Sequence, residues 1–132
     1  MPAIPKRARA AEAPQPIAER DIQHAIRLRL GLERDLVLFR NAQAFTEVWN
    51  ARTGKADMFR SGLGKGTADL VGILAPRGRW VSFEVKRAGE KRTEAQELHA
   101  ALIKRMGGFA CVVRSEQDAV DALERARMEA SE

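Results

Sequence analysis

Three charged residues stand out because their types and their spacing suit chemistry on phosphates. Glu84 and Lys86 lie two residues apart in the segment Arg79–Lys86, and Asp69 lies earlier, with fourteen residues between it and Glu84. Alternate residues of a strand point to the same face, so Glu84 and Lys86 would lie about 6.6 Å apart along a strand. A carboxylate beside an ammonium group near a strand end forms a compact polar site.

Asp69 belongs to an earlier segment with strand character, Thr67–Leu74, although aspartate is disfavoured in strands. The short connection at residues 75–78 contains Pro and Gly and is typical of a turn, so an antiparallel pair is expected. Counting outward from this turn places Asp69 opposite positions 84 to 85. The sequence therefore predicts that two carboxylates and a lysine converge on one face of a sheet.

This combination of side chains fits a divalent metal. Mg²⁺ prefers hard oxygen ligands, usually one or two carboxylates with water and substrate phosphate. Such an ion would offset the repulsion between Asp69 and Glu84, acidify a bound water and polarise a phosphodiester. Lys86 would orient or help deprotonate the attacking water and stabilise charge on the phosphate. Taken singly, each residue has a simpler explanation, such as an exposed ion pair worth less than about 1 kcal/mol.

The elements that must position these residues follow from hydrophobic periodicity. Apolar residues at helical spacing predict a first helix from about Ile17 to Leu30, and Gly31 ends it. The same reasoning predicts strands over Leu36–Arg40, Thr67–Leu74, Arg79–Lys86 and Phe109–Arg114, and further helices over Thr93–Met106 and Glu116–Met128. Residues 41–65 form an irregular stretch, for which a short helix near Thr46–Asn50 and a loose hairpin remain alternatives.

The expected fold class is α/β, with helices flanking a central mixed sheet. The helix between the last two strands implies one right-handed crossover. The residues expected to face inward are Leu98, Leu102 and Met106 in one helix and Ala119, Val120 and Leu123 in the last helix, which Ser115 caps. His24 and His99 are interpreted as surface or interface residues. Trp49 and Trp80 are interpreted as packing residues, with the alternative that either covers a partner surface.

Composition places the chain among soluble globular proteins that suit an anionic partner. The 132 residues are 45% hydrophobic and 31% charged, with a net charge of +5, which favours a polyanion such as nucleic acid. Four of the five prolines fall within residues 1–16, which are expected to form a flexible basic tail before one domain at 17–132. No apolar run is long enough for a membrane span, and the single Cys111 suits a reducing, cytoplasmic compartment.

The residues also resemble a known group of nucleases. Asp69 followed by Glu84-Val85-Lys86 resembles the PD-(D/E)xK nuclease superfamily, and more closely the small stand-alone VRR-NUC domains typical of phages and bacteria. Ala68 replaces the proline that precedes the aspartate in that superfamily. The similar pieces lie between Glu19 and Gln117 and include Ile22-Gln23, Phe39-Arg40-Asn41, Gly64-Lys65-Gly66-Thr67, Phe83-Glu84-Val85-Lys86, Thr93-Glu94-Ala95-Gln96 and Gly107-Gly108-Phe109-Ala110.

The resemblance implies a restriction-endonuclease-like core of order αβββαβ and a site for Mg²⁺ or Mn²⁺. The metal ligands it implies are Asp69, Glu84 and the carbonyl of Val85, with Glu19 of the first helix approaching the metal region. It implies Lys86 as the catalytic lysine and Gln96 as a supporting residue from the next helix. Two of these residues keep ordinary alternatives: an acid favours the first turn of a helix, and Gln96 could be solvated.

The resemblance further implies a metal-dependent DNA endonuclease of bacteria or phage-infected cells, similar to Holliday junction resolvases. Such proteins tend to be homodimers, and branched substrates such as four-way junctions or flaps are expected. Candidate phosphate contacts, each of which could instead be simply solvated, are Arg40, Lys65, Arg87, Lys91 and Arg92. The alternatives are a non-catalytic nucleic-acid-binding module of the same fold, and an RNA-directed or nicking nuclease.

Overall fold

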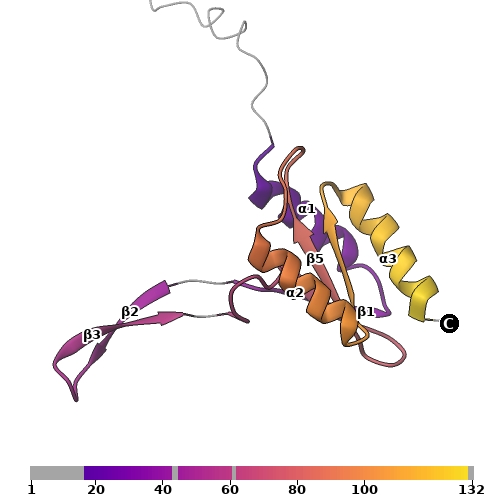
Figure 1. Ribbon diagram of the computed structural model, residues 1–132. Coiled ribbons are helices and arrows are strands. Elements are labelled where there is room, and N and C mark those ends of the chain that lie inside the picture. Colours follow the sequence, from indigo (N-terminus) through magenta and orange to yellow (C-terminus); the bar gives the residue numbers. More distant parts are fainter. Residues whose placement is uncertain (1–16, 43–44, 61, 131–132) are drawn as a thin grey trace, which may run out of the picture.

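A mixed four-stranded sheet forms the body of the molecule, with a separate two-stranded hairpin beside it (Figure 1). The computed structural model describes residues 17–42, 45–60 and 62–130, so the tail expected at residues 1–16 lies outside the described residues. The elements are α1 (Glu19–Leu30), β1 (Leu36–Arg40), β2 (Phe45–Asn50), β3 (Lys55–Arg60), β4 (Leu70–Leu74), β5 (Arg79–Val85), α2 (Glu94–Arg105), β6 (Phe109–Val113) and α3 (Glu116–Ala130).

The sheet has the order β1-β4-β5-β6 and combines both kinds of strand pairing. β4 is antiparallel to both β1 and β5, whereas β6 is parallel to β5. A parallel neighbour needs a crossover connection, and α2 supplies it between β5 and β6. The predicted fold class, α/β with a mixed central sheet flanked by helices, is therefore confirmed.

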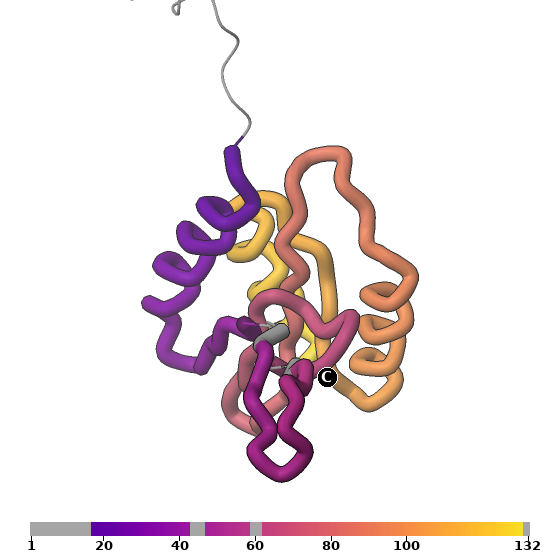
Figure 2. The backbone as a smooth tube through the Cα atoms, turned by 90° about the vertical axis from the view of Figure 1, so that its left-hand side faces the viewer, coloured from indigo at the N-terminus to yellow at the C-terminus, as the bar shows by residue number. Residues whose placement is uncertain are grey.

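Helices cover the two faces of the sheet unequally. α1 and α3 pack on one face, where Val81, Phe83 and Val85 of β5 are fully buried beneath Ile26 and Leu123. α2 lies on the opposite face, and Figure 2 shows α1 and α2 on either side of the strands. The alternation in β5 thus separates an apolar face, which forms the core, from a face carrying Ser82 and Glu84.

The inward face predicted for α2 is wrong. Leu98 and Met106 are 66% and 77% exposed, and Leu102 is exposed as well. The helix instead turns Gln96, His99, Ala100 and Ile103 towards the sheet, of which Ala100 is buried. The reason is a close approach that only small residues permit, because a Cβ on Gly66 would lie 2.4 Å from the Ala95 carbonyl oxygen and one on Gly108 would lie 2.7 Å from Ile103.

The irregular stretch expected at residues 41–65 contains a β-hairpin, not a short helix. β2 and β3 pair in register from Phe45↔Arg60 to Asn50↔Lys55. The Asn50 side chain organises the turn, since its Oδ1 accepts from the Arg52 backbone at 3.0 Å and its Nδ2 donates to Asp57 at 2.8 Å. The hairpin projects away from the body in Figure 1, and the expectation that Trp49 is a packing residue is wrong.

Smaller differences concern the ends of the other elements. The predicted strand Thr67–Leu74 begins only at Leu70, because Asp69 uses its side chain to accept from the β5 backbone. Ser115 caps α3 as predicted, with its Oγ accepting from the Asp118 backbone at 3.0 Å. Trp80 is half-buried and donates to Ser82. Among the described residues, no helix has the length and apolarity needed to cross a membrane.

The close approach at Gly66 gives a direct test of how α2 is held. Gly66 and Gly89 have φ values of +85° and +82°, but a Cβ on Gly89 would meet nothing within 4 Å. Both Gly66→Ala and Gly89→Ala incur the left-handed penalty of about 1 kcal/mol, so their difference isolates the clash with α2. We expect Gly66→Ala to lose about 1–3 kcal/mol more in urea unfolding, the usual cost of overpacking. Equal losses in the two variants would show that α2 does not depend on this contact.

Candidate active site

Asp69 and Glu84 meet where β4 begins and β5 ends. Leu70 pairs with Phe83, so Asp69 falls opposite Glu84 as the residue count predicts. Asp69 reaches across to β5, where its Oδ2 accepts from the backbone N–H of Val85 at 3.0 Å. The hydrogen bond fixes one oxygen of Asp69 and leaves the carboxylate beside that of Glu84.

The carboxyl group of Glu84 has a strongly raised pKa. Its side chain faces α2 and the residue is only 5% exposed. Burial, followed by the negative charge of Asp69 and a hydrogen bond with it, raises the pKa of Glu84 to about 8. Two carboxylates this close cannot both ionise easily, so at neutral pH Glu84 keeps its proton unless a cation takes its place.

Lys86 directly follows β5, two residues beyond Glu84 and on the same side by the alternation of the strand, and is 8% exposed. The positive charge of Lys86 acts against the rise in the pKa of Glu84 and also in that of Glu19. A nearly buried ammonium group beside the acidic pair partly compensates their charge. The structure thus brings together the three residues that the sequence singled out.

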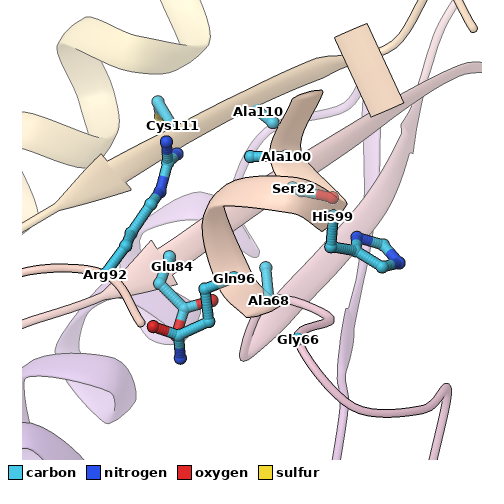
Figure 3. A pocket seen from close by; sticks show the side chains of 10 residues that line it. All are labelled: Gly66, Ala68, Ser82, Glu84, Arg92, Gln96, His99, Ala100, Ala110 and Cys111. Carbon is cyan, nitrogen blue, oxygen red and sulfur yellow. The ribbon is translucent and has the colours of Figure 1, made fainter. Parts of the chain in front are cut away.

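Gln96 supports Glu84 from the first turn of α2. Its Nε2 donates to Glu84 Oε1 at 2.8 Å, while its Oε1 accepts from the Thr93 backbone at 2.8 Å. Thr93 in turn caps the helix by accepting from the Gln96 backbone at 3.2 Å. The capping box and the contact with the site therefore share one side chain, so the alternative of a solvated glutamine does not hold. Figure 3 shows Gln96 beside Glu84.

Glu19 stands at the start of α1, half-buried, on the side of the acidic pair. Burial raises the pKa of Glu19, and the negative charges of Asp69 and Glu90 raise it further. Glu19 therefore senses the charge of Asp69, in keeping with its expected approach to this region. It is also an acid in the first helical turn, so both interpretations of this residue describe its position.

An open hollow of about 340 Å³ lies over the acidic pair. Its walls come from α1, from the end of β1, from the loop before β4 and from α2. The lining residues include Gln23, Arg40, Asn41, Thr67, Asp69 and Gln96. A smaller cavity lies deeper, between α2 and the sheet, and Figure 3 shows the side chains around it.

Asn41 is a site residue that sequence reasoning did not single out. Its Nδ2 donates to the Ala68 carbonyl at 3.1 Å, and its Oδ1 accepts from the Leu63 backbone at 3.0 Å. Its own N–H donates to the Asp69 carbonyl at 2.8 Å. Asn41 therefore fixes the backbone on both sides of the hollow. An asparagine after a strand is common in loops, and although Asn41 belongs to the similar piece Phe39-Arg40-Asn41, no role was assigned to it.

The five candidate phosphate contacts have different surroundings. Arg40 is exposed and lines the hollow, and Lys65 is exposed in the adjoining loop. Arg87 forms an ion pair with Glu90, so its charge is already engaged. Arg92 is half-buried, and in Figure 3 it extends towards Cys111. Lys91 is exposed in the loop between β5 and α2.

The two histidines differ from each other. His24 is exposed on α1, as expected for a surface residue. His99 is half-buried, and its Nε2 lies 3.3 Å from the hydroxyl of Thr67, so it packs α2 against the loop before β4. Of the two positions predicted for His99, surface or interface, this one corresponds to an interface between α2 and the loop before β4.

Comparison with models of known protein families and with the sequences of curated proteins found no match to this chain. Among the described residues, no group of three or more His, Cys, Asp or Glu side chains is arranged to hold a metal. Any cation at this place would depend on two carboxylates and on backbone oxygen.

The donor set nevertheless has the chemistry that a hard cation needs. Asp69 and Glu84 offer carboxylate oxygens, and the raised pKa of Glu84 marks a place where positive charge is favourable. Because the Val85 N–H points to Asp69, the carbonyl of Val85 is directed to the same side of the strand. These three groups fit one small divalent ion with room left for water and phosphate in the hollow.

The raised pKa of Glu84 gives a prediction with a defined sign. In the unfolded chain Glu84 loses its proton near pH 4.5, whereas in the folded protein it keeps the proton up to about pH 8. Its contribution to stability is therefore full below pH 4.5 and is lost as the pH rises to 8. We expect Glu84→Gln to be more stable than the wild type by about 1–3 kcal/mol at pH 8 in chelator, and not at pH 4.

Urea unfolding at the two pH values measures this difference, with Glu97→Gln as the control on the exposed side of α2. Adding Mg²⁺ at pH 8 should raise the melting temperature of the wild type and leave that of Glu84→Gln unchanged. A variant that is less stable than the wild type at pH 8 in chelator would contradict the electrostatic account of the pair.

Proposed function

We propose that this protein is a metal-dependent endonuclease that hydrolyses phosphodiester bonds in DNA. The observation that carries the proposal is the pair Asp69 and Glu84, which lines an open hollow, with the buried Lys86 two residues beyond Glu84. The resemblance of these residues to the PD-(D/E)xK motif, and to VRR-NUC domains in particular, points to the same activity.

Asp69, Glu84 and the Val85 carbonyl would hold Mg²⁺ or Mn²⁺. When bound, such an ion polarises the phosphodiester and makes the attacking water more acidic. The protein itself contributes positioning. Val85 N–H orients Asp69, and Gln96 orients Glu84, each through a hydrogen bond of 3.0 Å or less. The two carboxylates are thus held in place before substrate arrives, which lowers the cost of assembling the site.

Lys86 is the residue that acts on the reacting groups in this proposal. Its ammonium group donates hydrogen bonds that orient the attacking water and stabilise the charge that develops on the phosphate. Water attacks phosphorus, the bond to the 3′ oxygen breaks, and the products carry a 5′-phosphate and a 3′-hydroxyl. Arg40, at the wall of the hollow, is placed to hold a neighbouring phosphate.

The favoured substrate is branched DNA such as a four-way junction or a flap. A chain of 132 residues offers little surface for reading base sequence, so recognition of the backbone and its shape is the better match. The net charge of +5 supports binding to a polyanion. The bacterial or phage setting of this activity follows from the resemblance alone.

Cleavage assays on linear, flap and four-way DNA with Mg²⁺ test this function. We expect Lys86→Ala and Asp69→Asn each to reduce the cleavage rate about 100-fold or more, the scale at which one electrostatic contact contributes. Lys104→Ala, which removes an exposed lysine at the far end of α2, should leave the rate unchanged. Cleavage that survives either site substitution or chelation would refute the metal site.

Two other results would redirect the proposal. Binding of DNA without cleavage in Mg²⁺ or Mn²⁺ would favour a non-catalytic nucleic-acid-binding module of this fold. Cleavage of RNA, or of one strand only, under the conditions in which branched DNA is left intact would favour an RNA-directed or nicking nuclease.

A homodimer is part of the same proposal, and exposed apolar residues support it. α2 leaves the β1 and β4 half of its face uncovered, where Val37 and Ile73 pair across the strands and are exposed together with Phe39. Leu98 and Leu102 of α2 are exposed as well. Exposed apolar patches of this kind mark interaction surfaces, and a second copy of the chain would cover them under two-fold symmetry.

Light scattering measures this association directly. We expect a mass of twice 14.7 kDa for the wild type at micromolar concentration. Ile73→Lys should shift the mass towards that of a single chain, because it places a charge in the apolar patch. Leu32→Lys, which changes an exposed leucine after α1, serves as the control and should not alter the mass. A wild-type mass of one chain would refute the dimer.

A further inference from the structure

The hairpin of β2 and β3 projects away from the body of the molecule (Figure 1). Asn41 and Ala42, just before the hairpin, line the hollow that contains the acidic pair, and so do Gly66 and Thr67, a few residues after it. A ligand that lies along the hairpin would therefore reach the acidic pair at the root. The hairpin and the acidic pair are thus neighbours in the fold.

The hairpin exposes large side chains that proteins normally bury. Trp49 is 68% exposed and Met58 is 64% exposed. Trp49 pairs with Ala56 and Met58 pairs with Glu47, so the tryptophan and the methionine are diagonal neighbours on one face of the hairpin. A two-stranded hairpin by itself is marginally stable in water, so a ligand that covers this face would also stabilise the hairpin.

The charge of the hairpin tip identifies the kind of ligand. Arg52 lies in the turn and Lys55 directly follows it, and both are exposed. The exposed acids Glu47 and Asp57 lie further from the turn, along the two strands. Near the root, Arg40 and Lys65 are exposed as well. Exposed positive charge at the tip and at the root, with an exposed indole between them, complements a nucleic acid, which offers phosphates and aromatic bases.

Asn41, just before the hairpin, forms hydrogen bonds with the backbone after the hairpin and beside the acidic pair. Through its side chain it holds the returning leg at Leu63 and the segment before β4 at Ala68. Through its backbone it holds Asp69. The backbone segments next to the hairpin are therefore hydrogen-bonded beside the acidic pair, so a strand bound along the hairpin would lead towards the hollow.

We propose that the β2–β3 hairpin is an arm that binds the nucleic acid substrate outside the active site. Arg52 and Lys55 contact the sugar–phosphate backbone, and the indole of Trp49 stacks on an unpaired base. Stacking accepts every base, so the arm selects unpaired or branched structure and not sequence. The inference depends on the proposed function for the nature of its ligand and adds the element that recognises it.

The charge contribution is tested by binding in chelator, where cleavage does not interfere. Fluorescence anisotropy with labelled four-way DNA compares the wild type with Arg52→Glu/Lys55→Glu. We expect at least tenfold weaker binding, and a slope of log Kd against log salt that is smaller by about two, one for each phosphate contact. Lys104→Glu/Arg105→Glu has the same change in net charge at the other end of α2 and should keep the wild-type slope.

The stacking contribution has a signal of its own, because the chain contains only two tryptophans. Trp80→Phe leaves Trp49 as the single indole, whose fluorescence should be quenched when branched DNA is added. Trp49→Ala should weaken binding to flap and four-way DNA about tenfold and affect linear duplex less. Circular dichroism melting of each variant checks that the body stays folded.

The proposal that the β2–β3 hairpin binds nucleic acid would be overturned by either of two results. One is an unchanged affinity and salt slope in Arg52→Glu/Lys55→Glu, and the other is an unchanged Trp49 fluorescence on DNA binding. Light scattering that shows Trp49→Ala converting a dimer into single chains would also overturn it and assign the hairpin to a second copy. The binding assays need no catalysis, so they remain decisive if no cleavage is found. Wild-type binding by the arm variants together with metal-dependent cleavage would refute the arm and retain the nuclease.

Discussion

The close contact of two carboxylates, Asp69 and Glu84, is the constraint on which the rest of the structure depends. The contact is unfavourable in itself, since burial and mutual repulsion raise the pKa of Glu84 to about 8. Hydrogen bonds from Val85 and Gln96, and the charge of Lys86, offset part of this cost. The core on the opposite face of β5 must supply the remaining stability, because Val81, Phe83 and Val85 are fully buried there.

The division of β5 into two faces also explains the position of α2. A face that carries Ser82 and Glu84 provides little apolar surface, so α2 approaches it through small residues and presents Gln96 to the acid. One helix positioned in this way covers β5 and β6 and leaves the β1 and β4 half of the same face open. The polar site and the exposed apolar patch thus have a common cause, and the proposed dimer would cover what the single chain leaves open.

Asn41 connects the acidic pair to the backbone segments around it. Three hydrogen bonds join it to the backbone before the acidic pair and to the returning leg of the hairpin. These hydrogen bonds lie beside the hairpin, whose own strands contact mainly each other. Recognition and catalysis would be coupled through these hydrogen bonds, and not through the core.

Local patterns in the sequence were sufficient to predict the four strands of the central sheet and the pairing of Asp69 with Glu84. Alternation along β5 and the short turn before it depend on neighbouring residues, so counting from the turn correctly placed Asp69 opposite Glu84. The inward face of α2, the choice between hairpin and helix at residues 45–60, and the role of Asn41 were decided only by the tertiary structure. Leu98 has the spacing of a core residue, yet it is exposed, because which face a helix buries depends on the surface that meets it. That surface is assembled from segments far apart in the chain, and no local pattern encodes it.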